Sequence, residues 1–342
     1  MGRASVLLIY TGGTIGMKPD PTTGTLVPFD FNSIYDEFPS LRRLDVELDI
    51  FPFAPIDSSN VEPGLWVRLS EIIRDKYEKY DGFVVLHGTD TMSYTSSALS
   101  FMLRNLAKPV VFTGSQIPIG VLRTDGRENL ITAIEIAASH DENGRAKVPE
   151  VSLYFQNRLF RANRTKKYSA EELSAFTSFN YPPLADVGVG IHYRTEAIAP
   201  HPTGEFSINT SLSRDVAVIK MFPGITEPVL RTMLSTPGLK GIVLETYGAG
   251  NAPTFDWFLR VLEEAISRGI HIVNVSQCIS GSVNMDLYET GRRMQDIGVI
   301  SGRDITTEAA LAKMMFLLGQ ELNSEELVRL MKTSLRGEIS AE

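Results

Sequence analysis

The fold is decided by the stretch VLLIYTGGTIG at residues 6–16, an unbroken apolar run that passes directly into a glycine-rich loop. Because residues 6–10 are continuously apolar rather than alternating, they predict a strand buried on both faces, as in a parallel sheet covered by helices. The same pattern recurs in residues 82–87, 109–113 and 151–155. These runs predict further strands of one sheet.

Amphipathic segments separate the apolar runs. Residues 62–79, for example, place their leucines and isoleucines on one stripe, as a surface helix requires. Alternating strands and helices indicate an α/β protein. Between residues 194 and 214 the apolar pattern gives way to Pro, Thr, Ser and Gly, and it returns after residue 214. We therefore predict a larger N-terminal parallel-sheet domain at residues 1–195, a linker at 196–214 and a smaller C-terminal α/β domain at 215–342.

Charge and cysteine content limit the classes of partner and compartment. The chain has 342 residues, and its 33 Lys and Arg against 41 Asp and Glu give a formal net charge of −8. An acidic chain argues against nucleic-acid and membrane partners, because both favour basic surfaces. No apolar run approaches the ~18 residues that span a bilayer. The single cysteine, Cys278, cannot form an intramolecular disulfide, so we expect a cytoplasmic protein in which this side chain is small and buried.

Polar side chains gather where the predicted strands end. Thr14 follows the first strand, Thr89 and Asp90 follow the strand at 82–87, and further polar loops occur at 57–60 and 114–116. Ligands of open parallel sheets bind beyond the carboxyl ends of the strands. Each loop alone also fits a glycine turn, a phosphate cradle or a helix cap. Their repetition at successive strand ends favours a catalytic or binding site.

Several catalytic templates are excluded by the residue pattern. The five histidines are scattered without metal-ligand spacing, and H-E-x-x-H is absent, so we expect no metal site. Neither G-x-S-x-G nor S-x-x-K occurs, and the glycine pairs at 188–190 and 248–250 lack the third glycine of a dinucleotide site. We therefore expect no cofactor, and a hydroxyl nucleophile whose base is a lysine, a tyrosine or a carboxylate.

Taken together, TGGTIG at residues 11–16 and HGTDTM at residues 87–92 resemble the two signature motifs of the bacterial-type asparaginase/glutaminase family. The resemblance extends from residue 6 to about residue 337 and favours the cytoplasmic type I branch. The other matching segments are YTSSALSFML at 94–103, TGSQIP at 113–118, NRT at 163–165, YGAGNAP at 247–253, QC at 277–278, Gly281 and VNM at 283–285. The resemblance implies a two-domain asparaginase-like fold with a flavodoxin-like larger domain.

The resemblance also implies a reaction, namely hydrolysis of the side-chain amide of L-asparagine to L-aspartate and ammonia without a cofactor. In this family pattern Thr14 is the nucleophile, and it forms a β-aspartyl ester that water cleaves. Thr89, Asp90 and Lys167 form a second cluster in which the lysine and the carboxylate polarise the threonine. Ser58 and Ser59 match positions that hold the substrate α-carboxylate, and Asp90 matches the position that holds its α-ammonium group.

The chain departs from the family pattern at two places. A tyrosine that contacts the nucleophile in many members is missing from the loop at 17–27, where Thr25 stands near its place. We still expect that loop to act as a mobile lid. An allosteric asparagine pocket of some type I enzymes contains an arginine where this chain has Glu245 before Thr246, and Lys166 replaces a neutral threonine. Cys278 matches a residue of that pocket. We predict no asparagine cooperativity through it.

In the family, a neighbouring subunit completes the active site. The resemblance therefore implies a homodimer or homotetramer in which Asn251 is donated by the partner, with Asp286 or Tyr288 nearby. Alternatives remain. The same chemistry could act on glutamine or on a glutamyl group carried by transfer RNA. Relatives with ankyrin repeats have lipase-type activity, but this chain shows no such repeat. A chain that binds the amino acid without turnover would be a sensor.

Overall fold

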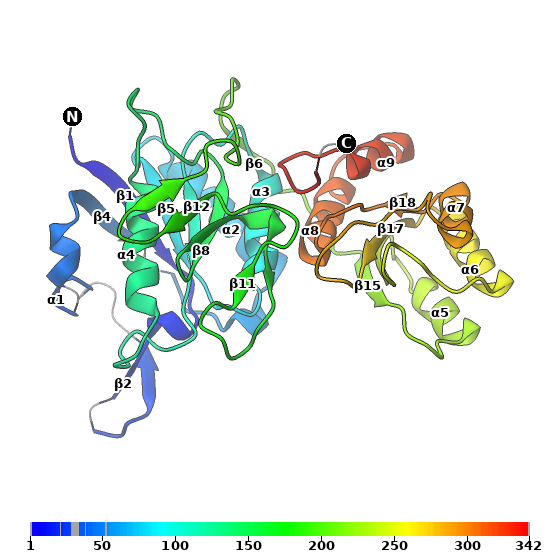
Figure 1. Cartoon of the computed structure of the whole chain (residues 1–342), viewed down its shortest axis with the longest axis horizontal. Helices are drawn as coiled ribbons and strands as arrows, with labels where there is room; N and C mark the ends of the chain where they lie inside the picture. Colours follow the sequence, from blue (N-terminus) through cyan, green and yellow to red (C-terminus); the bar gives the residue numbers. More distant parts are fainter. Residues whose placement is uncertain (1, 21, 29–33, 38, 52, 341–342) are drawn as a thin grey trace. The chain divides into compact units, whose positions relative to one another are not determined.

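The computed structural model describes residues 2–20, 22–28, 34–37, 39–51 and 53–340 (Figure 1). The chain divides into two compact units, one comprising Met1–Ser178 and Pro182–Thr210 and the other Phe179–Tyr181 and Ser211–Glu342. Each unit is an α/β structure, so the predicted fold class is confirmed. None of the helices in the described ranges is long and apolar enough to cross a membrane.

The first unit is built on an eight-stranded sheet. Its strands are β1 (Ala4–Tyr10), β4 (Val46–Phe51), β5 (Gly82–Leu86), β7 (Val110–Thr113), β8 (Val151–Phe155), β9 (Arg158–Arg161), β12 (Ala185–Val187) and β13 (Ile191–Tyr193). They lie in the order β13-β12-β9-β8-β7-β5-β1-β4. The strands from β4 to β8 in this order pair in parallel, which aligns their carboxyl ends along one edge.

The sheet is mixed, whereas the sequence predicted a parallel one. The direction changes after Phe155, where Gln156 and Asn157 have φ angles of 42° and 68°. Two successive positive φ angles are typical of the two-residue turns that join antiparallel strands. β9 therefore pairs antiparallel with β8, and β12 and β13 continue the antiparallel part. The prediction is correct for the five strands from β4 to β8 and wrong beyond Phe155.

Helices cover this sheet and explain its continuously apolar strands. The helices of the first unit are α1 (Ile34–Glu37), α2 (Pro63–Lys76), α3 (Met92–Met102) and α4 (Gly126–Ala137). α4 packs against β5, β7 and β8, whereas α3 packs against β8 and α2. In Figure 1 the strands lie between α4 and α3. All five residues of β5 and of β8 are buried as a result.

Part of the predicted linker packs onto the first unit. β14 (Ser207–Ile208) pairs with β6 (Leu103–Arg104), and the ring of Phe206 stacks on Tyr77 with centroids 3.7 Å apart. The polar composition of residues 196–214 did not indicate these contacts, because one aromatic ring and a short backbone pairing make them. The division between the units falls after Thr210.

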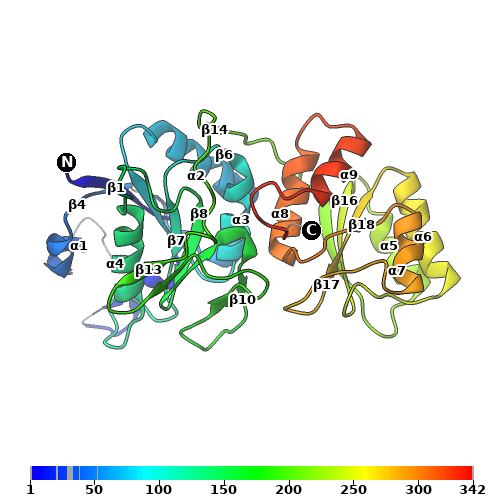
Figure 2. The ribbon, with the colours of Figure 1, turned by 45° about the horizontal axis from the view of Figure 1, so that its top comes forward.

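The second unit contains a four-stranded parallel sheet in the order β15-β16-β17-β18 (Figure 2). Its strands are β15 (Val216–Lys220), β16 (Gly241–Thr246), β17 (His271–Ser276) and β18 (Ile300–Ser301). Its helices are α5 (Glu227–Leu234), α6 (Asp256–Ser267), α7 (Glu289–Asp296), α8 (Thr307–Leu318) and α9 (Ser324–Lys332). α5 packs against α6, and α8 packs against β15, β16 and β17.

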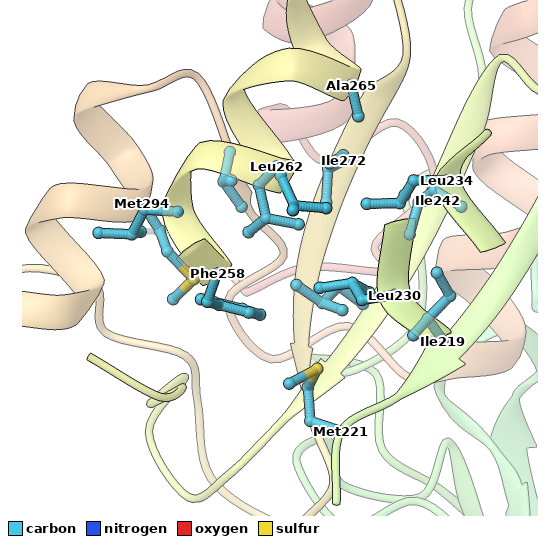
Figure 3. Close-up of a cluster of buried hydrophobic side chains, with 14 of the residues drawn as sticks. Ile219, Met221, Leu230, Leu234, Ile242, Phe258, Leu262, Ala265, Ile272 and Met294 are labelled. Atoms are coloured by element: carbon cyan, nitrogen blue, oxygen red, sulfur yellow. The ribbon is translucent and has the colours of Figure 1, made fainter. Parts of the chain in front are cut away.

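The core of the second unit is an apolar cluster between the sheet and α5, α6 and α7 (Figure 3). Phe258, Leu262 and Ala265 extend from one face of α6 and are fully buried, as their i, i+4, i+7 spacing requires. Leu230 on α5 and Met294 on α7 complete the cluster. The sequence did not predict α7, because Met294 is its only large buried side chain.

A buried ion pair fastens the C-terminal segment to α8. The ammonium group of Lys313 lies 2.6 Å from Glu338 Oε1, and both side chains have an exposed fraction of 0%. Lys313 also donates to the carbonyl oxygens of Met331 and Thr333. Burial lowers the pKa of Lys313, and the opposite charge of Glu338 counteracts that shift. The C-terminal segment thus forms part of the core rather than a surface extension.

Candidate active site

The polar loops that follow β1, β5 and β7 interlock with the loop carrying Ser58. A Cβ atom on Gly13 would lie 2.4 Å from the Gly88 Cα atom, and one on Gly88 would lie 2.5 Å from Ser58 Oγ. A Cβ atom on Gly114 would lie 2.5 Å from the carbonyl oxygen of His87. Only glycine fits at such approaches. The loops therefore form one continuous surface at the edge where the parallel strands end.

The first loop presents Thr14 to solvent. Gly12 and Gly13 have φ angles of 122° and 89°, so the chain turns through a region that favours glycine. One turn of 3₁₀ helix, η1 (Thr14–Gly16), follows. Within it Ile15 is fully buried and Thr14 is exposed. The buried isoleucine anchors the turn and leaves the neighbouring hydroxyl accessible.

Alanine at Gly13 is expected to destabilise the protein by about 2–5 kcal/mol, because a strained φ angle adds to a collision with the Gly88 backbone. Gly24→Ala is the matched control, because Gly24 has a φ angle of 69° but no heavy atom within 4 Å of the position that a Cβ atom would take. It should cost only about 1–2 kcal/mol. Calorimetric unfolding of the two variants measures the difference, and equal losses would contradict the interlocking of the loops.

Ser58 and Ser59 occupy a short 3₁₀ turn, η4 (Ser58–Asn60). Asp57 caps this turn by accepting from the backbone N–H of Ser59 at 2.9 Å and from its hydroxyl at 2.7 Å. These bonds lower the pKa of Asp57. Ser58 is buried against Gly88, and its carbonyl oxygen accepts from the Thr91 hydroxyl at 2.8 Å. Both serines therefore have defined positions beside the Gly88 loop.

Thr89, Asp90 and Lys167 meet in one hydrogen-bonded cluster. Lys167 Nζ lies 2.8 Å from Thr89 Oγ1 and 2.7 Å from Asp90 Oδ1. Thr89 is buried, whereas the Asp90 side chain is 63% exposed and the Lys167 side chain 19%. The cluster therefore combines an enclosed hydroxyl with an accessible carboxylate that can receive a cationic ligand group.

Strand geometry decides which of two adjacent lysines joins the cluster. β10 (Lys166–Lys167) pairs antiparallel with β11 (Phe176–Thr177), and Lys167 lies opposite Phe176. Successive side chains of a strand point to opposite faces. Lys167 therefore reaches Thr89, and Lys166 is directed to the other side.

Gln116 and Asp125 also lie at the site. Gln116 belongs to the polar loop at 114–116 that the sequence places after a strand, although no individual role was predicted for it, and Asp125 was not predicted at all. Gln116 Oε1 accepts from the Thr89 hydroxyl at 3.3 Å. The buried carboxylate of Asp125 accepts from the backbone N–H groups of Gln116 and Ile117, both at 3.0 Å. Asp125 directly precedes α4, so its sequence position alone suggests a helix cap.

His87 is neutral at physiological pH. The imidazole is fully buried beside Phe112, and burial lowers its pKa to about 4. Its Nδ1 lies 2.7 Å from the carbonyl oxygen of Gly88, to which a neutral imidazole donates. His87 therefore supports the Gly88 backbone and does not titrate as a base near pH 7.

Thr25 lies in a hairpin formed by β2 (Met17–Pro19) and β3 (Leu26–Pro28). Its exposed hydroxyl is 2.7 Å from Thr23 Oγ1, which in turn lies 3.1 Å from Asp20 Oδ1. Figure 1 shows the hairpin, labelled β2, extending from the body of the first unit. Thr25 is thus held within its own turn.

In the second unit, Asn251 closes a turn after β16. Its backbone N–H donates to the carbonyl oxygen of Tyr247 at 2.8 Å, and the side chain is half-buried. Asn284, which precedes the exposed Asp286, donates from its backbone to Ala249 in the same turn at 2.9 Å. The two predicted partner-facing segments therefore lie side by side within this unit. Tyr288 precedes α7 and is 51% exposed.

The residues at the positions of the family's allosteric pocket, where we predicted no cooperativity, have structural contacts. Glu245 Oε1 accepts from the Thr307 hydroxyl at 2.6 Å, at the start of α8. Cys278 is exposed, so the prediction that it is buried is wrong. Its backbone N–H bonds to Ser276 Oγ at 3.0 Å in the turn that leaves β17, which directs the following residues to the surface. Across the part of the chain that the structure describes, no three His, Cys, Asp or Glu side chains gather as metal ligands.

Comparison with known proteins shows similarity over the whole chain. The family described as "Asparaginase, N-terminal" matches residues 5–199, and "Glutaminase/Asparaginase C-terminal domain" matches residues 215–331. L-asparaginase 1 of Escherichia coli (strain K12) is 43% identical over 344 residues, which cover 100% of both chains. The 60 kDa lysophospholipase of Mus musculus is 40% identical over 363 residues, which cover 98% of this chain and 62% of that protein.

A solved structure has the same fold. The crystal structure of L-asparaginase I from Vibrio cholerae O1 biovar eltor matches with a TM-score of 0.89 and 41% sequence identity. The match covers 99% of this chain and 100% of that one. The similarity therefore includes both α/β units.

Proposed function

Because this chain belongs to the asparaginase family, we propose that it hydrolyses L-asparagine to L-aspartate and ammonia. The observation that carries this proposal is the Thr89–Asp90–Lys167 cluster, with distances of 2.7–2.8 Å. Its Thr89 and Asp90 lie on a loop that is interlocked with the one presenting Thr14. A hydroxyl nucleophile beside an enclosed polar cluster suits acyl transfer from an amide.

In the proposed reaction the Thr14 hydroxyl attacks the side-chain amide carbon of asparagine. The new C–O bond replaces the C–N bond, and the nitrogen leaves as ammonia with the proton of Thr14. Water then cleaves the β-aspartyl ester, which releases aspartate and restores the threonine. Lys167 and Asp90 polarise Thr89 beside this centre, and no cofactor takes part.

Both charged groups on the α-carbon of the amino acid have suitable partners on the same surface. The exposed Asp90 carboxylate can receive the α-ammonium group. Ser58 and Ser59, at the turn beside Gly88, can receive the α-carboxylate. Holding the α-ammonium and α-carboxylate groups orients the side-chain amide toward Thr14, which favours the reaction by positioning.

We also propose that the protein is cytoplasmic and assembles into a homodimer or homotetramer. The exposed free thiol of Cys278 suits a reducing compartment. Asn251 of a second copy would complete the site, with Asp286 or Tyr288 nearby, and the exposure of these two residues supports their availability. The Glu245 carboxylate accepts a hydrogen bond from Thr307, and its charge would repel the carboxylate of a second asparagine at the allosteric position. We therefore expect the reaction rate to depend hyperbolically on asparagine concentration. A sigmoidal curve abolished by Glu245→Ala would contradict this expectation.

A lysophospholipase activity is the second candidate, because the mouse relative that bears this name is 40% identical to the chain. The test compares three substrates with the purified protein: ammonia release from L-asparagine and from L-glutamine, and fatty-acid release from a lysophospholipid. We expect ammonia from asparagine. If calorimetry shows that asparagine binds but no ammonia is released, the proposed hydrolase activity is refuted and the protein is a sensor. Release of fatty acid alone would favour the lysophospholipase activity.

A further inference from the structure

We infer that Gln116 is a positioning residue that fixes the direction of the Thr89 hydroxyl proton. The inference rests on the proposed hydrolase function. It uses the contacts of one side chain that connects the Thr89 loop with the segment following Lys167.

The orientation of the Gln116 amide is determined by its partners. Its Nε2 lies 3.2 Å from the carbonyl oxygen of Ala170 and 3.2 Å from that of Glu172. Carbonyl oxygens only accept hydrogen bonds, so the NH₂ group must face them. The amide oxygen therefore faces Thr89, and the assignment of its two ends follows from chemistry.

The direction of the Thr89 proton follows from this orientation. The amide oxygen of Gln116 can only accept, so the Thr89 hydroxyl donates to it across 3.3 Å. The ammonium group of Lys167 can only donate, so it occupies a lone pair of the same hydroxyl at 2.8 Å. A hydroxyl oxygen has two lone pairs, which leaves one for a third donor. The remaining lone pair of the Thr89 hydroxyl can therefore accept a hydrogen bond from a group at the reaction centre.

The backbone of Gln116 is fixed independently of its side chain. Asp125 accepts from the N–H groups of Gln116 and Ile117, and Asn129 donates to both Asp125 and the carbonyl oxygen of Gly114. Asp125 and Asn129 are buried. The side chain therefore extends from a rigid base, as a positioning group requires.

Two substitutions separate the contacts of Gln116. Gln116→Glu keeps an oxygen for Thr89 and removes the donor to the two carbonyls, whereas Gln116→Met removes both. We expect Gln116→Met to lower kcat for asparagine about 3- to 10-fold with KM nearly unchanged, the effect of losing one orienting hydrogen bond. Gln116→Glu should retain more of kcat than Gln116→Met. Glu172→Ala is the control for the loop, because it removes the contact with Tyr168 and leaves Gln116 in place.

A readout without turnover separates this inference from the proposed function. Threonine-methyl NMR of the full chain reports the side-chain rotamer of Thr89, with its resonance assigned by Thr89→Ser. We expect a shifted or averaged Thr89 methyl resonance in Gln116→Met and an unchanged one in Glu172→Ala. An unchanged resonance in Gln116→Met overturns the inference, whether or not the wild type releases ammonia. Equal kcat losses in Gln116→Met and Glu172→Ala would also overturn it, because they would assign the role to the loop.

Discussion

Thr14→Ala is expected to lower ammonia release from asparagine by roughly 10⁴-fold or more, because it removes the atom that forms the acyl bond. The fold should be unaffected, since Thr14 is exposed and its neighbour Ile15 anchors the turn. Ammonia release at saturating asparagine and calorimetric unfolding together measure the two effects. Undiminished turnover in this variant would refute the proposed nucleophile.

Two control variants make this result specific. Thr14→Ser keeps a hydroxyl and should retain measurable turnover, whereas Thr236→Ala removes an exposed threonine from the turn after α5 and should not change the chemical step. Lys167→Met tests the second cluster. It should lose turnover without loss of the Thr14 side chain, because Thr89 then lacks its cationic donor.

Lys313→Met is expected to lower the free energy of unfolding by about 3–5 kcal/mol, because it leaves the Glu338 carboxylate buried without a counter-charge. Glu338 also accepts from the backbone N–H groups of Leu335 and Arg336, so it cannot swing out to water without breaking those bonds. Calorimetric unfolding measures the loss. Limited proteolysis should cleave the C-terminal segment faster in the variant.

The controls distinguish burial from charge. Replacing both partners, Lys313→Met with Glu338→Leu, should recover most of the loss, since a buried pair contributes little beyond an apolar one of similar size. Lys240→Ala removes an ammonium group 2.8 Å from Asp215 in a pair that is 56% and 43% exposed, and it should cost at most about 1 kcal/mol. A similar cost for Lys313→Met and Lys240→Ala would contradict the burial argument.

Strands and helices with strong patterns were predicted from the sequence, and long-range pairing was not. β8 has the predicted bounds because its continuous apolar run ends at a polar turn. The reversal after Phe155 depends on the φ angles of two residues, Gln156 and Asn157, neither of which is glycine. Hydrophobic patterning carries no information about such a turn.

The positions of candidate residues followed from the sequence where neighbouring residues carry the signal, and contacts between distant residues did not. Thr14, Thr89 and Asp90 stand directly after strands, so their convergence follows from parallel pairing. The contact of Gln116 with the carbonyl oxygens of Ala170 and Glu172 spans more than 50 residues and involves backbone groups, which any sequence would supply. Cys278 was misplaced because the general burial of cysteine was applied to a residue in a surface turn.

The interlocked glycines also limit how this surface could be redesigned. Gly13 and Gly114 both touch the loop at residues 87–88, and Gly88 touches the loop that carries Ser58, so a single loop grafted from a relative would have to fit its new neighbours just as closely. Transplants should succeed only as complete sets. Because Ser59 and Asp90 are proposed to hold the charged groups of the amino acid, changes of substrate range are better sought at other exposed side chains, while the scaffold stays constant.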